Sequence, residues 1–101
     1  MFPALPTQLD SRLTALGEKY RARGIDLFVF GSFARGDNRP NSDLDLGLEW
    51  RAHRSDALLR ELQNEVDDLP TIRKIDLVDF STVSPQWRSI AERDRRFLFA
   101  Q

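Results

Sequence analysis

Three aspartates and a Gly-Ser pair are the residues whose types and spacing suggest chemistry. Gly31-Ser32 precedes Asp43 and Asp45 by a ten-residue gap, and Asp76 lies further along the chain. Close carboxylates raise one another's pKa unless a cation intervenes, and Mg²⁺ prefers oxygen ligands that substrate phosphates complete. A glycine admits phosphate close to the backbone, and a hydroxyl at a helix start binds phosphate oxygens. These residues therefore indicate phosphoryl or nucleotidyl transfer assisted by a pair of metal ions.

The elements that must position these residues follow from hydrophobic spacing and turn signals. In chain order, the sequence predicts a helix over 7–23, a strand over 25–30, a helical turn over 32–36 capped by Ser32, a strand over 43–50, a helix over 55–69 capped by Ser55, a strand over 75–80, and a helix from Ser84 to the terminus. The prediction is an α/β (α+β) fold of order α-β-α-β-α-β-α. About three strands form a small mixed sheet, with helices covering one face.

The connections predict how the strands run. The link over 32–42 is compact, so the first two strands can lie antiparallel. The link over 51–74 contains a helix and allows a right-handed crossover, so the second and third strands should be parallel. Asp43, Asp45 and Asp76 then meet at the edge where Gly31-Ser32 ends the first strand.

Side-chain parity supports the same grouping. Leu44 and Leu46 should face the covering helices, which leaves the aspartates on the opposite face. We expect Gly47 to keep that face open. Asp79 has the opposite parity and lies further along its strand, so it is a weaker candidate than Asp76.

Composition limits the classes of function. The 101 residues fit one small domain, 1–101. Lys plus Arg number 15 and Asp plus Glu 16, giving a net charge of −1, which argues against stable nucleic-acid binding and against acidic membranes. Basic residues near the terminus alternate with acids and are interpreted as a solvated helix face.

Residue usage also limits the metal and the compartment. The chain has no cysteine and one histidine, which excludes disulfides, thiolate sites and a multi-histidine zinc site, so any metal must be a hard cation. No apolar run reaches the roughly 18 residues of a membrane span, and the N-terminus does not begin a secretory signal. A cytoplasmic location is expected.

Each motif residue also has an ordinary structural explanation. Asp43-Leu44-Asp45 alone is typical of any half-exposed strand, and Ser32 alone is typical of a helix cap. Arg35 and Arg39 could assist phosphates or could equally be solvated surface. The combination is more specific, because four fixed positions match by chance on the order of 10⁻³ times in a chain of this length.

The spacing resembles the signature of the nucleotidyltransferase superfamily that includes DNA polymerase β. The string GSFARGD followed by RPNSDLDL, in so short a chain, is similar to the minimal nucleotidyltransferases (MNT), which are commonly paired with HEPN-domain proteins as antitoxin and toxin. The resemblance implies that Gly31 and Ser32 contact the triphosphate of ATP. It also implies that Asp43, Asp45 and Asp76 hold Mg²⁺, two ions in all, with Asp76 near the attacking hydroxyl as a candidate base.

The resemblance further implies an activity: AMP transfer from ATP to a tyrosine of a HEPN toxin, which silences its RNase activity. A non-catalytic antitoxin that binds its partner stoichiometrically is the alternative. A small-molecule nucleotidyltransferase is a third possibility, disfavoured by the absence of an acceptor domain in the sequence. The segment 97–99 is either a partner contact or a helix end that faces the core.

Overall fold

A four-stranded mixed sheet forms the centre of the computed structural model, which describes residue 2 and residues 4–99. Its strands are β1 (Ile25–Phe30), β2 (Leu44–Trp50), β3 (Ile75–Asp79) and β4 (Arg96–Phe97), in the order β3-β2-β1-β4. β1 is antiparallel to β2 and to β4, and β2 is parallel to β3. The predicted directions of the first three strands are confirmed.

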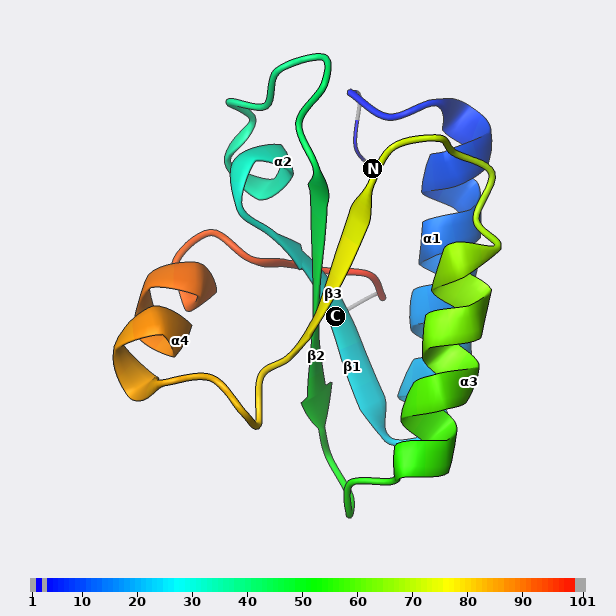
Figure 1. Ribbon diagram of the computed structural model, residues 1–101, viewed down its shortest axis with the longest axis vertical. Coiled ribbons are helices and arrows are strands. Elements are labelled where there is room, and N and C mark those ends of the chain that lie inside the picture. The colour runs from blue at the N-terminus through cyan, green and yellow to red at the C-terminus, as the bar shows by residue number, and fades with distance from the viewer. Residues whose placement is uncertain (1, 3, 100–101) are drawn as a thin grey trace.

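Helices cover both faces of this sheet (Figure 1). The helices are α1 (Thr7–Arg21), α2 (Ser32–Arg35), α3 (Asp56–Asp67) and α4 (Pro85–Glu92). α1 and α3 lie side by side on one face, whereas α4 lies on the other (Figure 1). The prediction that helices cover one face is therefore incomplete. Within the described residues, no helix combines the length and apolarity needed to cross a membrane.

The main core lies between the sheet and the α1–α3 layer. β2 supplies Leu44, Leu46 and Leu48, all fully buried, as the alternation in the sequence predicts. α1 contributes a buried stripe that includes Leu9 and Leu13, which confirms the helical spacing read from the sequence. This packing fixes β2 so that its odd-numbered residues face away from the main core.

A second, smaller core covers the opposite face. Phe28, Phe30 and Phe80 are buried there, and Ala91 of α4 packs against them. A β-carbon on Gly47 would lie 2.3 to 2.8 Å from ring atoms of Phe28 and Phe80. The expectation that Gly47 keeps this face open is wrong: its missing side chain makes room for the aromatic rings.

The C-terminal segment departs from the predicted helix. α4 ends at Glu92, and β4 then pairs with β1, whose outer edge would otherwise be unpaired. The amide of Leu98 donates to the carbonyl of Leu27 at 2.9 Å, and Leu98 and Phe99 are buried. Of the two interpretations of segment 97–99, core packing holds for Leu98 and Phe99, although in a strand extension rather than a helix.

Of the serines at the predicted helix starts, Ser55 and Ser84 cap their helices and Ser32 does not. The hydroxyls of Ser55 and Ser84 accept hydrogen bonds from the first turns of α3 and α4. Ser32 is not a cap, because Gly31 occupies the N-cap position of α2 with φ of 75° and ψ of −150°. Only glycine adopts such backbone angles readily, so the turn after β1 depends on residue 31.

Candidate active site

The three aspartates meet at the edge of the sheet where β2 and β3 begin. Asp45 stands opposite Asp76 in the parallel register, and Asp43 immediately precedes β2. The pKa of Asp45 is raised by partial burial first, and then by the charges of Asp76 and Asp43. The charges of Asp76 and Asp43 are therefore close enough to disfavour the ionisation of Asp45.

The carboxylates do not form a ready-made metal cluster. Within residue 2 and residues 4–99, no three carboxylate or imidazole groups converge tightly enough to hold an ion. Asp43 is exposed, Asp76 is 41% exposed, and Lys74 Nζ lies 3.6 Å from a carboxylate oxygen of Asp76. The chemistry of the three aspartates nevertheless fits a hard cation, because each supplies anionic oxygen. The repulsion that Asp45 experiences from Asp43 and Asp76 also favours a positive charge between them.

Gly31 and Asp45 touch across the strand reversal. A β-carbon at position 31 would lie 2.4 Å from Oδ2 of Asp45. The glycine therefore has two roles: it adopts a positive φ, and it leaves space for the carboxylate. The sequence predicts that the Gly-Ser turn and the aspartates of the second strand meet at one edge of the sheet. The structure confirms this placement for Gly31 and Asp45.

An open groove of about 530 Å³ contains the centre of this edge. Its polar wall includes Gly31, Ser32, Arg35 and Asp45. Arg35 Nε donates to Asp37 at 3.1 Å. That contact and the charge of Asp37 raise the pKa of Arg35, with smaller contributions from Asp94 and Asp45. The guanidinium therefore remains cationic beside the groove.

Arg39 does not share this position. It lies exposed in the turn before β2, where its amide donates to Ser42 Oγ at 2.7 Å, and the lining of the groove includes Arg35 but not Arg39. The turn is held by Arg73, whose Nη1 donates to the carbonyl of Ser42 at 2.5 Å and whose guanidinium stacks 4.8 Å from the Phe33 ring centre. Sequence reasoning missed Arg73, because nothing local marks a cation that reaches across 31 residues.

Asp79 is separated from the other aspartates, as its parity predicts. It stands opposite Leu48, three positions along β3 from Asp76, and only 10% of its side chain is exposed. Burial acts to raise its pKa, but hydrogen bonds from Ser81, Arg54 and Trp50 outweigh burial and lower it. Asp79 is therefore a structural residue, whose charge is stabilised by hydrogen bonds within the chain.

No role was predicted from the sequence for the α4 side of the groove. Trp87, Ile90 and Ala91 of α4 line it, together with Arg93 and Asp94 that follow the helix. One signal was present in the sequence: Asp94 interrupts the apolar stripe of the predicted terminal helix. Charge-assisted hydrogen bonds from Arg88 and Arg95 to Glu49, at 2.7 and 2.6 Å, hold α4 and the chain after it against β2.

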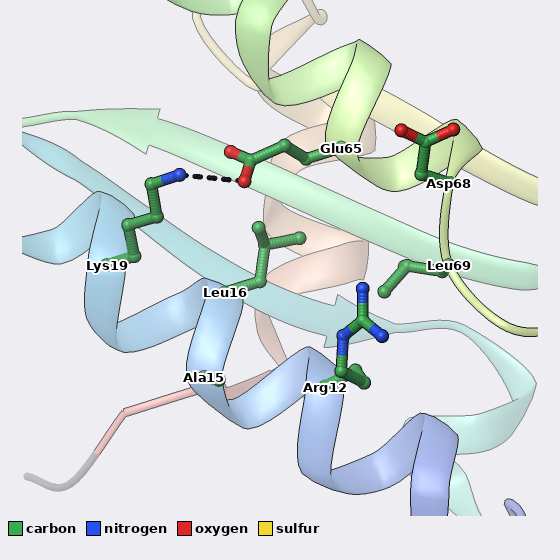
Figure 2. A pocket seen from close by; sticks show the side chains of 7 residues that line it. All are labelled: Arg12, Ala15, Leu16, Lys19, Glu65, Asp68 and Leu69. Atoms are coloured by element: carbon green, nitrogen blue, oxygen red, sulfur yellow. Dashed lines mark hydrogen bonds and ion pairs between the residues drawn. The ribbon is translucent and has the colours of Figure 1, made fainter.

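A second hollow, of about 230 Å³, lies between α1 and α3 (Figure 2). It is lined by Arg12, Ala15, Leu16, Lys19, Glu65, Asp68 and Leu69. Lys19 Nζ and Glu65 Oε1 pair across it at 2.7 Å. None of the candidate site residues reaches this hollow, since it lies in the helical layer on the face that buries Leu44 and Leu46.

A Gly-Ser turn facing paired strand aspartates on a small mixed sheet is the arrangement of a nucleotidyltransferase. Residues 21–101 match the family Polymerase beta, Nucleotidyltransferase, and the chain belongs to this family. Two Methanocaldococcus jannaschii proteins, named "Putative protein adenylyltransferase" MJ0126 and MJ1217, are each 34% identical over 80 residues. That alignment covers 78% of this chain and 79% of each relative.

Solved structures share the fold. A structure titled "Structure of putative minimal nucleotidyltransferase" is 28% identical with a TM-score of 0.72, over 87% of this chain and 90% of the other. A toxin–antitoxin complex with AMP-PNP contains a chain with a TM-score of 0.65 at 20% identity, over 91% and 73%. A complex of the tri-AMPylated Shewanella oneidensis HEPN toxin with its MNT antitoxin gives 0.60 at 17%, over 92% and 71%. The predicted fold is confirmed.

Proposed function

We propose that this chain transfers AMP from ATP to a tyrosine hydroxyl of a HEPN RNase toxin and thereby acts as its antitoxin. The observation that carries the proposal is the contact of Gly31 with Asp45 in the groove, with Asp76 opposite Asp45 on β3. The names of the Methanocaldococcus relatives support a protein acceptor. The Shewanella complex supports a HEPN partner.

Each site residue has a role in the proposed reaction. Asp43, Asp45 and Asp76 would hold Mg²⁺, two ions in all, and bound Mg²⁺ would supply charge stabilisation to the transferring phosphoryl group. The backbone at Gly31 and the hydroxyl of Ser32 bind the triphosphate.

The arginines differ in their proposed roles. Arg35 adds positive charge to the groove, and its place in the lining supports this role. Arg39 is exposed and does not line the groove. We therefore propose that it contacts only those phosphate oxygens of the triphosphate that face solvent.

The covalent step balances without a further reactant. The tyrosine oxygen bonds to the α-phosphorus of ATP, the bond from that phosphorus to the bridging oxygen breaks, and pyrophosphate leaves with the electron pair. The tyrosine proton passes to Asp76, which the proposal places beside the attacking hydroxyl. The 41% exposure of the Asp76 side chain is consistent with access from a second protein.

Stoichiometric binding without chemistry is the competing function. A binder has no need to keep Asp45 half-buried beside two other carboxylates, because that arrangement disfavours its charge. The raised pKa of Asp45 therefore favours catalysis. Residues 1–101 would act as one nucleotidyltransferase domain in the cytoplasm.

The test uses ATP labelled at the α-phosphate, Mg²⁺ and the co-expressed HEPN partner. Asp43→Ala and Asp45→Asn should each reduce label on the partner by at least about 100-fold, as should EDTA. Asp68→Asn is the matched control, since it removes an exposed carboxylate outside the groove. Equal labelling by wild type and both site variants, or neutralisation of the partner without ATP and Mg²⁺, would contradict the proposal.

A further inference from the structure

The α4 side of the groove carries large apolar side chains that are exposed to solvent. Among the described residues, three large hydrophobic side chains are exposed: Ile72, Trp87 at 41% and Ile90 at 61%. Trp87 and Ile90 both line the groove that contains Asp45. Exposed apolar side chains that gather at one concave site commonly mark a binding surface.

The tryptophan is held from behind by aromatic rings. Its ring centre lies 5.5 Å from that of Phe30, edge-to-face at 84°, and 5.3 Å from that of Phe80. Arg88, the next residue on α4, donates to the carbonyl of Phe80 and to Glu49, which anchors the helix to the sheet. The indole is therefore a pre-positioned aromatic surface, since both its backing and its helix are fixed.

The two sides of the groove differ in chemistry: one side is polar and charged, and the α4 side presents large apolar side chains. One side has Ser32 and cationic Arg35 beside Asp45. The α4 side has Trp87 and Ile90, and the charged Arg93 and Asp94 follow them just past the helix. A volume of about 530 Å³ lies in the range of small-molecule sites. A nucleoside triphosphate has an anionic chain at one end and a flat aromatic base at the other.

We propose that Trp87, supported by Ile90, binds the nucleobase of the nucleotide substrate by stacking. This inference rests on the proposed function and adds to it a residue that determines nucleotide affinity. Stacking recognises any base through its π-face, so Trp87 contributes affinity for nucleotides over bare polyphosphate. The occupant is the nucleotide itself, because the same groove continues directly into the polar wall at Gly31 and Asp45.

The experiment separates base binding from phosphate binding. The full chain is titrated by calorimetry with ATP and Mg²⁺, and in parallel with inorganic tripolyphosphate and Mg²⁺. Trp87→Leu should weaken ATP binding by about 5- to 150-fold and leave tripolyphosphate affinity unchanged. Trp87→Phe, which keeps an aromatic face, should retain most of the ATP affinity.

Two matched controls sharpen the result. Ile90→Ala should weaken ATP binding, whereas Ile72→Ala, which trims an isoleucine exposed outside the groove, should not. Trp50 lies on β2, where its Nε1 donates to Asp79, and it does not line the groove. Bound ATP should therefore quench the indole fluorescence of Trp87 both in wild type and in Trp50→Phe. Trp87→Phe should bind ATP without that quench.

Three outcomes would overturn the inference. Unchanged ATP affinity in Trp87→Leu alongside reduced transfer would assign the wall to the acceptor protein. An equal loss of ATP and tripolyphosphate affinity would assign Trp87 to fold integrity, and an unquenched indole in ATP-bound wild type would exclude stacking. These results leave the proposed function standing if Asp45→Asn still abolishes transfer, whereas a wild-type chain that binds no ATP contradicts both.

Discussion

Replacing Gly31 by alanine tests whether the turn after β1 and the carboxylate of Asp45 form one unit. The new β-carbon would lie 2.4 Å from Oδ2 of Asp45, a distance that requires one of the two to move. Asp45 cannot retreat with its backbone, since β2 is paired with β1 on one side and with β3 on the other. The side chain of Asp45 must therefore rotate out of its position in the groove.

The cost has two parts. Backbone angles of φ 75° and ψ −150° cost a residue with a side chain about 1 to 3 kcal/mol. Forcing the Asp45 side chain away from its rotamer adds about 1 kcal/mol. We expect Gly31→Ala to lower the free energy of unfolding by about 2 to 4 kcal/mol. AMP transfer should fall by at least about 100-fold, because Asp45 no longer faces the substrate.

Gly36→Ala is the matched control. Gly36 has φ of 82° at the end of α2, but a β-carbon there would meet nothing within 4 Å. This variant should lose about 1 to 2 kcal/mol of stability from the left-handed backbone alone. Its transfer activity should remain within about threefold of wild type, because Gly36 is absent from the lining of the groove.

Urea unfolding and single-turnover labelling of the partner measure the two effects. The double variant Gly31→Ala, Asp45→Ala should recover the clash component of stability but none of the activity, a non-additivity that independent sites do not show. Equal losses in Gly31→Ala and Gly36→Ala, in both assays, would refute the role assigned to the Gly31–Asp45 contact.

Two further predictions concern stability and pH. Asp79→Ala removes a carboxylate whose pKa is lowered, so it should cost about 2 to 3 kcal/mol at pH 7. The difference from wild type should shrink as the pH falls from about 4, where Asp79 of the unfolded chain begins to take up a proton, through the lowered pKa of Asp79 in the folded state. A pH-independent difference would contradict this. Asp45→Asn should raise stability at pH 7 in EDTA, since the folded state raises the pKa of Asp45 and so disfavours its charge. Urea unfolding at pH 3, where this advantage should vanish, provides the check.

The sequence was sufficient where a short-range period determines the outcome. Alternation over 43–50 placed Leu44 and Leu46 in the core, and the helical crossover made β3 parallel to β2. Those two facts set Asp45 opposite Asp76. Parity also separated Asp79 from the group, and its hydrogen bonds confirm a different environment.

The sequence was insufficient to predict structure that depends on which strand edges and core spaces the rest of the fold leaves open. The helical period of the last segment continues past Glu92, yet the chain leaves the helix because the outer edge of β1 accepts β4 and the main core accepts Leu98. The same limit explains Gly47. A glycine on a strand shows that space is needed, but only the fold shows that Phe28 and Phe80 fill it.

Asp45 and Asp79 together show how the fold distinguishes a working carboxylate from a structural one. Both lie on neighbouring strands and both are partly withdrawn from water. Trp50 and Ser81 are among the donors that stabilise the charge of Asp79, so the pKa of Asp79 falls. Groups within the chain therefore compensate its negative charge. At Asp45 burial and the charge of Asp76 dominate, so its pKa rises. A half-buried charge that the fold leaves undercompensated favours a cationic ligand, and its place in the groove beside Gly31 makes Asp45 the centre of the site.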